Sequence, residues 1–508
     1  MNLAMSSAQN TYSLSDLLAG IANVDAAKNP RLSGIEIDSR KVSPGDLFIA
    51  LPGARQHGNT YIDAAIRQGA IAVVYDASTE IPAGLNSEIP LIKITDISQQ
   101  AGFIASRFYN EPSKSMRVTG ITGTNGKTTC CVLLAQAYKY LGARPGIIGT
   151  LGMGLWGEMA ASTHTTPDTV TLQSEMSQLR DRGSDELLME ASSHGLEQGR
   201  VGGTEFNIAV LTNLSQDHLD YHGSMQDYAA AKAKLFQQYE LEVAIINADD
   251  AFGRQLLAGT INARRVFSYG LDTDDLQAAD VRAIDIELHS AGLKLLVDSP
   301  WGELHIESKL MGRFNAYNLL ACAAVLLAAG HKPDEVGQAL SIAESAAGRM
   351  QCFSSGRATV VVDFAHTPDA LQQALTALRE HIPARRLICV FGCGGDRDQA
   401  KRPVMGRVAE QFADVVIITD DNPRFEEAVA IRADILAGMQ EAGIEIANRR
   451  QAIKAAWAMA EHDDIILIAG KGHETTQQLG DLKVPFSDID VVTELLSESQ
   501  ARSTGETE

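Results

Sequence analysis

The fold of this chain is decided by Val118-Thr119-Gly120-Ile121-Thr122-Gly123-Thr124-Asn125-Gly126-Lys127-Thr128-Thr129. A β-prone run, residues 116–121, precedes the loop, and a helix-compatible segment, residues 128–141, follows it. Strand, glycine-rich loop and helix start, in that order, make a cradle in which backbone N–H groups and the positive end of the helix face an anion. Lys127 is placed to reach the outer phosphates, and the hydroxyl of Thr128 is placed to bind Mg²⁺.

The stretch therefore predicts a nucleoside-triphosphate site, although its spacing is imperfect, because Ile121 stands where the usual motif has its first glycine. The alternative is a Gly/Thr-rich turn between a strand and a helix that binds nothing. That alternative gives no reason for Gly-Lys-Thr-Thr at the very start of a helix.

Composition limits the class of protein. At 508 residues the chain is long enough for about three domains. Its net charge of −21 argues against binding to nucleic acid or to an anionic membrane surface. The longest apolar run, Leu319 to Ala329, is about half of the ~20 residues needed to span a bilayer, so we expect no membrane insertion. No secretory leader pattern is seen, and six thinly spread cysteines fit a reducing compartment. A cytoplasmic monomer is the expectation.

The pattern of strands and helices changes twice along the chain. We predict domains at residues 1–112, 113–348 and 349–508, with residues 110–115 as a linker after the first. In the first domain, short strands at 35–37, 47–50 and 71–74 alternate with a helix at 61–68. The polar segment 38–46 joins two of these strands. It is either a solvated connector or part of a site, and the residues alone favour neither.

Polar residues follow the predicted strands of the middle domain. The strand at 185–189 runs into Glu190, and the strand at 208–212 runs towards His218. Open α/β sheets keep their ligands at the carboxyl ends of their strands. If these strands are parallel neighbours of the first one, Thr128, Glu190 and His218 meet at one Mg²⁺. Each residue alone has an ordinary explanation, as a cap, a surface charge or a packed histidine; together with a phosphate loop they favour a site.

Two further segments carry candidate polar groups. In the helix around residues 228–236, Lys232 and Lys234 are two residues apart and do not share a face. We expect Lys234 to be solvated, and the pattern leaves Lys232 open. Asn318 is well placed to cap the apolar helix 319–329, whereas the amide of Asn315 has no such role and is suited to reading an adenine edge.

The last domain repeats the strand-end pattern. Strands at 359–363, 387–391, 415–419 and 465–469 each end in polar or glycine-rich residues, and Pro368 is suited to open a helix. The glycines at 392–395 lack the G-x-G-x-x-G spacing of a dinucleotide site, so NAD binding is not predicted. The fold class is α/β, with a parallel, P-loop ATPase-like sheet in the middle and a Rossmann-like domain at the C-terminus.

Taken together, these stretches resemble the Mur ligase family of peptidoglycan precursor synthesis. The residues that carry the resemblance are Gly123-Thr124-Asn125-Gly126-Lys127-Thr128-Thr129, Glu190-Ala191-Ser192-Ser193-His194-Gly195-Leu196, Asn213-Leu214-Ser215-Gln216-Asp217-His218-Leu219-Asp220, Lys232, Asp363-Phe364-Ala365-His366-Thr367-Pro368-Asp369 and Gly470-Lys471-Gly472-His473-Glu474. Asp38-Ser39-Arg40 and Asp421-Asn422-Pro423-Arg424 resemble the branch that adds diaminopimelate. The chain departs from that branch at His164, where Asn is common, so His164 is given no role.

The resemblance implies an ATP- and Mg²⁺-dependent ligase with the three-domain Mur ligase architecture. Its substrates would be UDP-MurNAc-L-Ala-D-Glu and meso-diaminopimelate, joined through an acyl phosphate. Glu190, His218 and a carbamylated Lys232 would join Thr128 at the metal, and Asn315, Arg349 and Asp363 would surround the nucleotide. Contacts to the UDP-sugar peptide would come from Ile37, Ser39, Ala54, Arg55, Gln56, Thr165, Thr166, Ser192, Gln198 and Arg200. Contacts to the amino acid would come from Arg397, Asp421, Asn422, Pro423, Arg424, Gly470 and Glu474.

The second carboxylate of diaminopimelate gives this assignment a physical basis. A guanidinium fork at Arg424, with Arg397 nearby, can grip a carboxylate with two hydrogen bonds, whereas lysine would leave it unpaired. Two rival functions remain. A related ligase such as folylpoly-γ-glutamate synthetase does not account for Asp38-Ser39-Arg40 or for Asp421-Asn422-Pro423-Arg424. A P-loop NTPase switch would hydrolyse its nucleotide without an amino acid.

Overall fold

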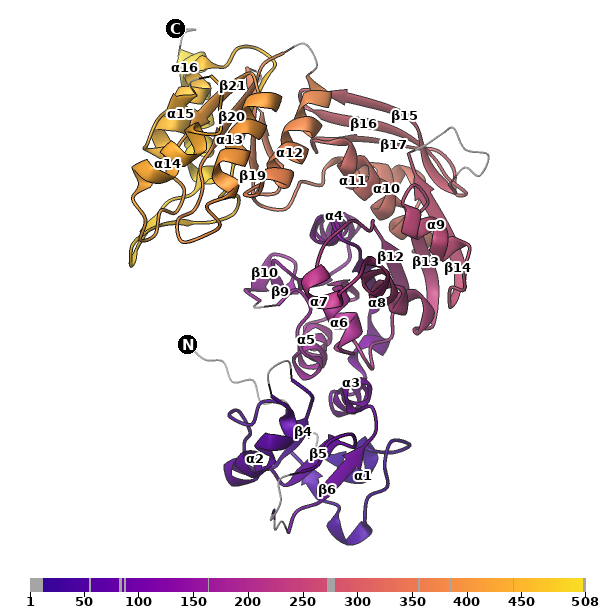
Figure 1. Cartoon of the computed structure of the whole chain (residues 1–508). Coiled ribbons are helices and arrows are strands. Elements are labelled where there is room, and N and C mark those ends of the chain that lie inside the picture. Colours follow the sequence, from indigo (N-terminus) through magenta and orange to yellow (C-terminus); the bar gives the residue numbers. More distant parts are fainter. Residues whose placement is uncertain are drawn as a thin grey trace. The chain divides into compact units, whose positions relative to one another are not determined.

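The computed structural model describes residues 12–505 except 54–55, 82–84, 86–87, 163, 272–278, 355–356, 383–384 and 442. The chain forms two compact units. One comprises residues 1–131, 142–246 and 250–266, and the other comprises residues 132–141, 247–249 and 267–508. Figure 1 labels the helices and strands and colours them along the sequence.

The first unit begins with a small parallel sheet in the order β3-β4-β5-β6. Its apolar strand residues pack against α3, because Leu47, Ile49 and Val74 share a buried cluster with Ile97 and Ile104. The strands and the helix predicted for this region are present, and the predicted linker contains a 3₁₀ turn, Pro112–Ser115. The elements are β1 Tyr12–Ser13, α1 Leu14–Leu17, β2 Arg31–Leu32, β3 Gly34–Glu36, β4 Asp46–Ala50, α2 Ile62–Gln68, β5 Ala72–Asp76, β6 Leu91–Ile94 and α3 Ile97–Phe108.

The same unit holds a second sheet, whose strands run in the order β10-β9-β8-β11-β7-β12-β13. Strand β7 lies between β11 and β12 and is parallel to both, which meets the condition that the sequence analysis set for a shared site. The carboxyl ends of these three strands therefore meet at one edge. The elements are β7 Arg117–Thr122, α4 Lys127–Tyr140 (which passes into the second unit after residue 131), β8 Pro145–Gly149, β9 Gly152–Leu155, β10 Glu158–Ala160, α5 Thr169–Asp181, β11 Glu186–Glu190, α6 Ser193–Glu197, β12 Ile208–Leu211, α7 Leu219–His222, α8 Met225–Gln237, β13 Leu241–Asn247 (whose last residue belongs to the second unit) and α9 Ala251–Leu257.

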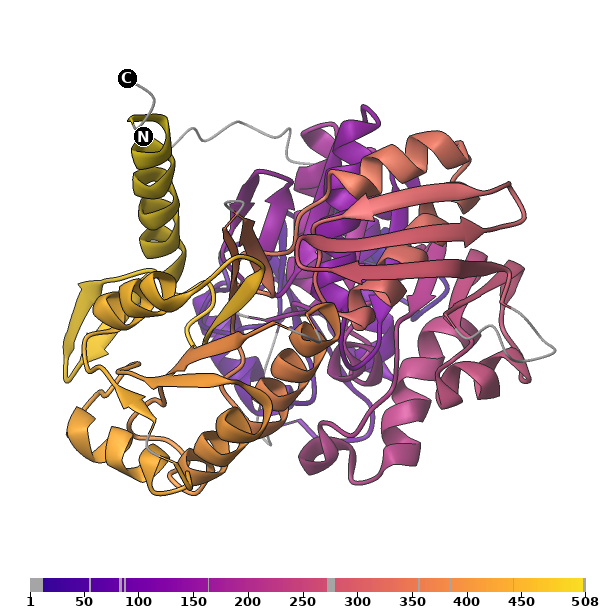
Figure 2. The same ribbon diagram turned by 90° about the horizontal axis from the view of Figure 1, so that it is seen from above.

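The second unit opens with antiparallel strands that the sequence analysis did not anticipate. Strand β15 pairs with β16, and β16 pairs with β17, both antiparallel, and Figure 2 shows the three lying side by side. Helix α10 follows and begins at Arg313, six residues before the predicted start. The elements are β14 Ala263–Gly270 (which crosses from the first unit), β15 Val281–His289, β16 Gly292–Asp298, β17 Leu304–Ser308, α10 Arg313–Ala328 and α11 Pro333–Ser341.

The C-terminal sheet has the order β18-β19-β23-β20-β21-β22, and its four predicted strands are present and parallel. One face packs on residues of α12, α13 and α14, and the other packs on residues of α15 and α16. Pro368 opens α12 as predicted, behind the capping hydroxyl of Thr367. The elements are β18 Gln351–Ser354, β19 Ala358–Asp363, α12 Pro368–His381, β20 Leu387–Phe391, α13 Lys401–Phe412, β21 Val415–Ile418, α14 Ala428–Leu436, β22 Ile444–Glu445, α15 Arg449–Met459, β23 Asp464–Ala469, β24 Thr476–Leu479, β25 Leu482–Pro485 and α16 Asp488–Gly505.

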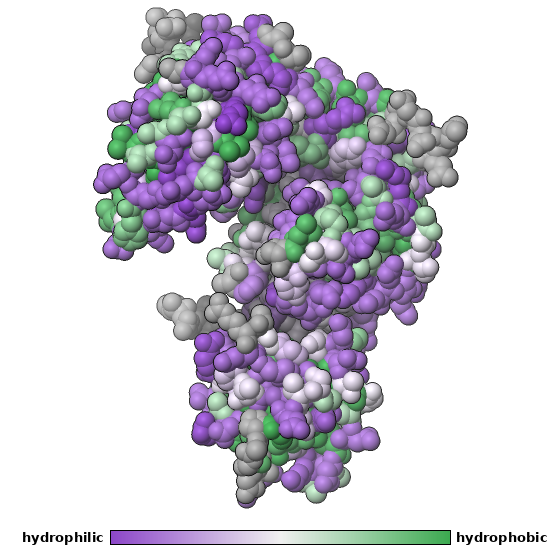
Figure 3. All heavy atoms as spheres, in the orientation of Figure 1, coloured by the Kyte–Doolittle hydropathy of each residue, from purple (hydrophilic) through white to green (hydrophobic). Residues whose placement is uncertain are grey.

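Hydrophilic side chains cover most of the face drawn in Figure 3, with apolar ones scattered between them. Across the described part of the chain, no helix is both long enough and apolar enough to cross a bilayer.

Candidate active site

The phosphate loop joins β7 to α4 and is braced by the residues that follow β12. Gly123 has a φ of +147°, and a Cβ there would stand 1.9 Å from the hydroxyl oxygen of Thr212, so only glycine fits. The backbone N–H of Thr124 donates to the carbonyl of Asn213 over 2.8 Å, and that of Asn125 donates to the Asn213 side chain over 2.9 Å. These hydrogen bonds to Asn213 therefore fix the backbone conformation of the loop.

Lys127 turns back onto this loop. Its Nζ donates to the carbonyl oxygens of Gly123 and Thr124 over 2.9 and 2.8 Å. Loss of hydration lowers the pKa of Lys127, although the carboxylate of Glu190 opposes that shift. The loop carbonyls therefore fix the position of this side chain beside the loop.

Thr128 and Glu190 are in direct contact. The hydroxyl of Thr128 lies 2.9 and 3.0 Å from the two carboxylate oxygens of Glu190, which is 1% exposed at the end of β11. The backbone N–H and the hydroxyl of Thr150 also donate to this carboxylate, over 2.8 and 3.2 Å. A hydroxyl and a carboxylate side by side are the oxygen ligands that Mg²⁺ prefers, so this pair fits the ion.

Lys232 points to the same loop from α8. It is 1% exposed, its Nζ donates to the carbonyl of Gly123 over 2.8 Å, and its ammonium stands 4.5 Å from the centre of the Tyr228 ring. Burial, with the positive charge of Lys127, lowers the pKa of Lys232 to about 6. Lys234 is not freely solvated as expected, because it pairs with Glu197 over 2.6 Å.

His218 has a left-handed backbone, with a φ of +53°, and stands at the start of α7. Its Nε2 lies 3.4 Å from Asp217, and its ring packs edge-on against His194 with centroids 4.9 Å apart. No contact to Thr128 or Glu190 is recorded for His218 in the described residues. Within that same part of the chain, no three His, Cys, Asp or Glu side chains gather as a metal-binding group. The structure thus brings Thr128 and Glu190 into contact, whereas His218 packs near Tyr228, with the two ring centroids 6.0 Å apart.

Five residues expected to contact the UDP-sugar peptide form a hydrogen-bonded network that starts at Glu190. Thr166 donates to the Glu190 carbonyl over 2.7 Å, and Arg200 donates to the Thr166 carbonyl over 2.9 Å. Four side-chain hydrogen bonds complete the network: Thr166 to Ser192 over 2.9 Å, Arg200 to Gln198 over 2.6 Å, Gln198 to Tyr221 over 2.8 Å, and Thr165 with Thr150 over 3.0 Å.

The N-terminal candidates lie around β3 and β4. Ile37 lines a cleft of about 330 Å³ together with Lys41, Tyr109 and Asp168. Ser39 is partly buried beside Asp38, and Gln56 is hydrogen-bonded to Tyr61. The hydrogen bond from Arg40 lowers the pKa of Asp38 to about 2. Ala54 and Arg55 lie outside the described residues.

Three further candidates for the nucleotide, Asn315, Arg349 and Asp363, lie in the second unit. Asn315 is 2% exposed and is held from both sides: its amide N–H donates to Met311 over 2.8 Å, and its oxygen accepts from Asn318 over 2.9 Å. The expectation that Asn318 caps a helix is wrong, because α10 starts at Arg313 and Asn318 lies inside it. Arg349 stacks over the Phe364 ring at 5.2 Å.

Asp363 is the third of these candidates. Its two carboxylate oxygens accept the backbone N–H groups of Met350 and Ala365 over 2.7 and 2.8 Å. Burial nevertheless raises the pKa of Asp363. The carboxylate therefore shapes the backbone on either side of the β19 end.

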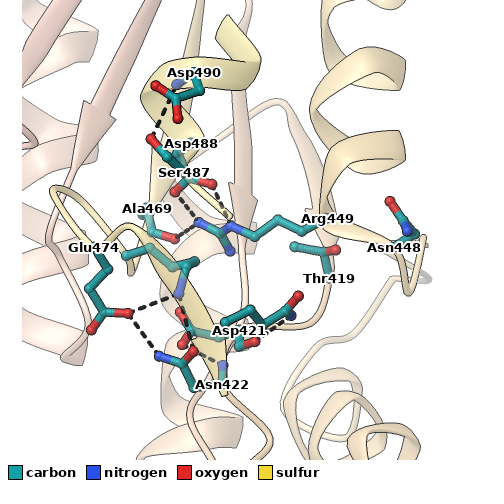
Figure 4. Close-up of polar contacts among 12 residues, drawn as sticks. Thr419, Asp421, Asn422, Asn448, Arg449, Ala469, Glu474, Ser487, Asp488 and Asp490 are labelled. Atoms are coloured by element: carbon teal, nitrogen blue, oxygen red, sulfur yellow. Dashed lines mark hydrogen bonds and ion pairs between the residues drawn. The ribbon is translucent and has the colours of Figure 1, made fainter. Parts of the chain in front are cut away.

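Six of the amino-acid candidates follow β21 and β23 in the chain, and Figure 4 labels three of them, Asp421, Asn422 and Glu474. Asn422 donates through its amide to Glu474 over 2.8 Å, and Gly470 leaves room for Asp421, whose carboxylate a Cβ would meet at 2.8 Å. Pro423 is buried, and Arg424, with a φ of +52°, donates to the carbonyl of Gly395 over 2.6 Å. Arg397 is exposed, and no hydrogen bond or ion pair in the described residues links it to Arg424.

Sequence reasoning missed three buried charged residues here. Lys471 is 0% exposed and donates to Glu474, and Arg449 and Asp488 form an ion pair of 2.8 Å with both side chains 0% exposed. The spacing of Lys471 and Glu474, three residues apart next to a strand end, could have signalled the first contact. Arg449 and Asp488 are 39 residues apart, and no pattern in the sequence links them.

The fold and the loop define the class: this is an α/β protein with a glycine-rich loop between a strand and a helix, of the kind that the sequence predicts for a triphosphate site. The chain matches the models of the Mur ligase family, catalytic domain (residues 31–109), the Mur ligase middle domain (121–326) and the Mur ligase, glutamate ligase domain (348–472). The chain belongs to the Mur ligase family. It is therefore an ATP-dependent ligase that forms amide bonds.

Relatives and a solved structure agree with this membership. The chain is 46% identical over 467 residues to the UDP-N-acetylmuramoyl-L-alanyl-D-glutamate--2,6-diaminopimelate ligase of Chromobacterium violaceum, covering 91% of this chain and 94% of that protein. It is 47% identical over 461 residues to the ligase of that name from Pseudomonas aeruginosa, covering 90% and 93%. A solved structure of a ligase with the same name has a TM-score of 0.78 at 36% identity, over 96% of this chain and 99% of the other.

Proposed function

We propose that this enzyme joins meso-diaminopimelate to the D-glutamate γ-carboxylate of UDP-MurNAc-L-Ala-D-Glu, with ATP cleaved to ADP and phosphate. The observation that carries the proposal is the contact of Thr128 with Glu190 at the phosphate loop. The names of relatives 46–47% identical over nine-tenths of the chain support the choice of substrates. We propose domain boundaries near residues 112 and 348, a monomer, and a cytoplasmic site of action, where ATP is supplied.

The reaction needs two displacements. A γ-carboxylate oxygen attacks the terminal phosphorus of ATP, the bond to ADP breaks, and an acyl phosphate forms. The diaminopimelate amine then attacks the acyl carbon, loses a proton, and expels phosphate from the tetrahedral intermediate. Phosphoryl transfer requires charge neutralisation and in-line placement. Lys127 can supply the first by exchanging the carbonyls of Gly123 and Thr124 for phosphate oxygens.

Mg²⁺, which we propose as the cofactor, would be held by Thr128 and Glu190 and would supply further positive charge against the triphosphate. His218 and a carbamylated Lys232 complete the proposed ligand set. The environment of Lys232 suits carbamylation, because burial lowers its pKa to about 6 and leaves the amine neutral at neutral pH. The neutral amine is the form that attacks CO₂, and the product is a carboxylate-like group.

We assign the nucleotide to Gly123, Thr124, Asn125, Gly126, Thr129, Asn315, Arg349 and Asp363, in addition to Lys127 and Thr128. We assign the UDP-sugar peptide to Ile37, Ser39, Ala54, Arg55, Gln56, Thr165, Thr166, Ser192, Gln198 and Arg200. What supports the second assignment is that its members from Thr165 to Arg200 share one hydrogen-bonded network with Glu190. A bound peptide would then end close to the carboxylate that we assign to the metal.

We assign the amino acid to Arg397, Asp421, Asn422, Pro423, Arg424, Gly470 and Glu474. The guanidinium of Arg424 would donate hydrogen bonds to the far carboxylate, and the far ammonium group would donate to Glu474. Lysine in place of diaminopimelate would leave the guanidinium without that partner. The loss is about 1–3 kcal/mol, enough for selection.

Phosphate release tests the proposal. We expect release from ATP only when UDP-MurNAc-L-Ala-D-Glu and meso-diaminopimelate are both present, with one phosphate for each amide formed. Equal release with neither acceptor present would identify an NTPase and contradict the proposal. Release that needs a different acceptor would identify another ligase activity.

A further inference from the structure

Lys471 is a completely buried cation at the end of β23, and nothing said so far gives it a role. It is 0% exposed. Its Nζ uses all three of its hydrogens, donating to Glu474 Oε2 over 2.8 Å, to the side-chain oxygen of Asn422 over 3.1 Å, and to the carbonyl of Thr476 over 2.8 Å. A buried ammonium with three oxygen partners is fixed in one position, because no other arrangement satisfies all three donors.

This ammonium fixes the amide of Asn422. The Asn422 oxygen accepts from Lys471 and from the backbone N–H of Gln478, over 3.1 and 2.9 Å. Its NH₂ group must then face the other way, and it donates to Glu474 Oε2 over 2.8 Å. A flip of the amide would set NH₂ against an ammonium and an N–H, so only the observed orientation is satisfied.

Both of these contacts end on the same oxygen of Glu474, as Figure 4 shows. The other oxygen, Oε1, has no recorded partner in the described residues, and the side chain is 35% exposed. The carboxylate is therefore held through Oε2, and Oε1 is left available to a ligand. Burial opposes its charged form, but the hydrogen bonds from Lys471 and Asn422 lower the pKa of Glu474.

A second buried pair stands behind this arrangement. Arg449, held by Asp488, donates to the carbonyl of Ala469 over 2.9 Å, next to Gly470. The positive charges of Arg449 and Lys471 lower the pKa of Asp421, although burial raises it overall. The charged groups that act on Glu474 and Asp421 are thus Lys471, Arg449 and Arg424, with the two carboxylates acting on each other.

We propose that Lys471 is a positioning residue for the amino-acid substrate: it orients Asn422 and Glu474 so that Glu474 Oε1 is left, negatively charged, to receive the ammonium group. Lys471 itself has no hydrogen left to offer a ligand, so it acts only through Glu474 and Asn422. The inference rests on the proposed function, because it concerns how that amino acid is held.

The test compares Lys471→Met with the wild type in steady-state kinetics. The KM for diaminopimelate is expected to rise about tenfold or more, with the KM values for ATP and for the UDP-linked substrate within about twofold of the wild type. Without the ammonium, burial raises the pKa of Glu474, so the fall of kcat/KM for diaminopimelate at low pH should begin at a higher pH. If Lys471 were purely structural, its loss would not raise the KM for diaminopimelate relative to the KM values of the other two substrates. It would also not shift the pH at which kcat/KM falls.

Arg386→Met is the matched control. Arg386 pairs with Asp464 over 2.9 Å at the opposite end of β23, so its loss removes an ion pair from the same domain without touching Asn422 or Glu474. Its KM for diaminopimelate should stay within about twofold of the wild type. A rise equal to that of Lys471→Met would show that any lost ion pair in this domain suffices, and would overturn the proposal.

Glu474→Gln supplies an independent arm. In that background Lys471→Met should raise the KM for diaminopimelate by less than about twofold further, because the carboxylate through which Lys471 acts is gone. Full additivity of the two losses would overturn the proposal. Lys471→Gln replaces Lys471→Met should the single variant fail to fold.

The two proposals fail differently. Absence of amide formation by the wild type with diaminopimelate would refute the proposed function. Amide formation by the wild type, with an unchanged KM for diaminopimelate in Lys471→Met, would refute only the role of Lys471.

Discussion

The ammonium groups of Lys127 and Lys232 donate to the same backbone oxygen, that of Gly123, over 2.9 and 2.8 Å. If both were protonated they would repel each other, and this repulsion adds to the loss of hydration in lowering the pKa of Lys232 to about 6, so the Lys232 amine is neutral at neutral pH. A triphosphate would draw Lys127 towards its oxygens, and carbamylation would remove the positive charge of Lys232. Both proposed events would reduce the electrostatic repulsion between Lys127 and a protonated Lys232.

The first prediction concerns Lys232. Lys232→Ala should lose activity by about 100-fold or more, because it removes a proposed metal ligand. Depletion of CO₂ and bicarbonate should lower wild-type activity, and intact-protein mass spectrometry should detect the added carbamate. The carbamate should be lost as the pH falls below about 6, where the amine becomes protonated. Lys234→Ala is the control, since Lys234 pairs with Glu197, and full activity of Lys232→Ala would contradict the assignment.

The second prediction concerns Lys127. Lys127→Ala should reduce kcat by about 10²–10³-fold or more, because the charge that builds up during phosphoryl transfer loses a positioned partner. Binding of the UDP-linked substrate, measured by calorimetry, should change little. Ligation at a near-normal rate would show that the loop does not hold the triphosphate.

The third prediction concerns Arg424. Arg424→Ala should raise the KM for diaminopimelate by about tenfold or more, because a carboxylate would lose its guanidinium partner. The KM for ATP should stay within about twofold. Steady-state kinetics with each substrate varied in turn separates the two, and equal losses for both substrates would refute the role of Arg424 in holding the amino acid.

These assignments show what local patterns reveal and what they miss. The β7–α4 loop and the strand ends at Glu190 and Asp421 were predicted because a glycine-rich turn and an apolar run followed by polar residues are visible within ten or so residues. The start of α10 was misplaced because Arg313–Asn318 is more polar than the rest of the helix, and tertiary burial of Asn315 and Asn318 decides the matter.

Longer-range contacts escaped prediction for a different reason. Lys234 and Glu197 lie on different helices, and the pair Arg449–Asp488 joins α15 to α16. Apolar residues reveal a buried face through their spacing, whereas no sequence pattern shows which residue a charged side chain will pair with. The antiparallel strands β15–β17 were missed although residues 284–289 and 304–308 alternate between apolar and polar side chains, because no ligand motif drew attention to them.

The fourth prediction concerns stability. Glu186 starts β11, and burial raises its pKa from 4.5 to about 7, against the opposing charge of Arg117 3.1 Å away. The folded state thus holds a proton that the unfolded state has released between those values, so Glu186 makes stability fall as the pH rises from about 4.5 to about 7.

Glu186→Gln should remove that part of the pH dependence. Relative to the wild type, its free energy of unfolding should be larger above about pH 7 than at about pH 4.5, by at most about 3 kcal/mol. Urea unfolding at several pH values measures the effect. An unchanged pH dependence in Glu186→Gln would show that the carboxyl group titrates normally.

The most direct measurement of the central claim is a competition assay in which meso-diaminopimelate and lysine are offered together with ATP, Mg²⁺ and UDP-MurNAc-L-Ala-D-Glu, and the products are resolved by mass. The account predicts a UDP-linked tripeptide that contains diaminopimelate in large excess over lysine, with one ADP formed for each amide. Equal incorporation of the two amino acids, or ADP formed without either, would contradict it.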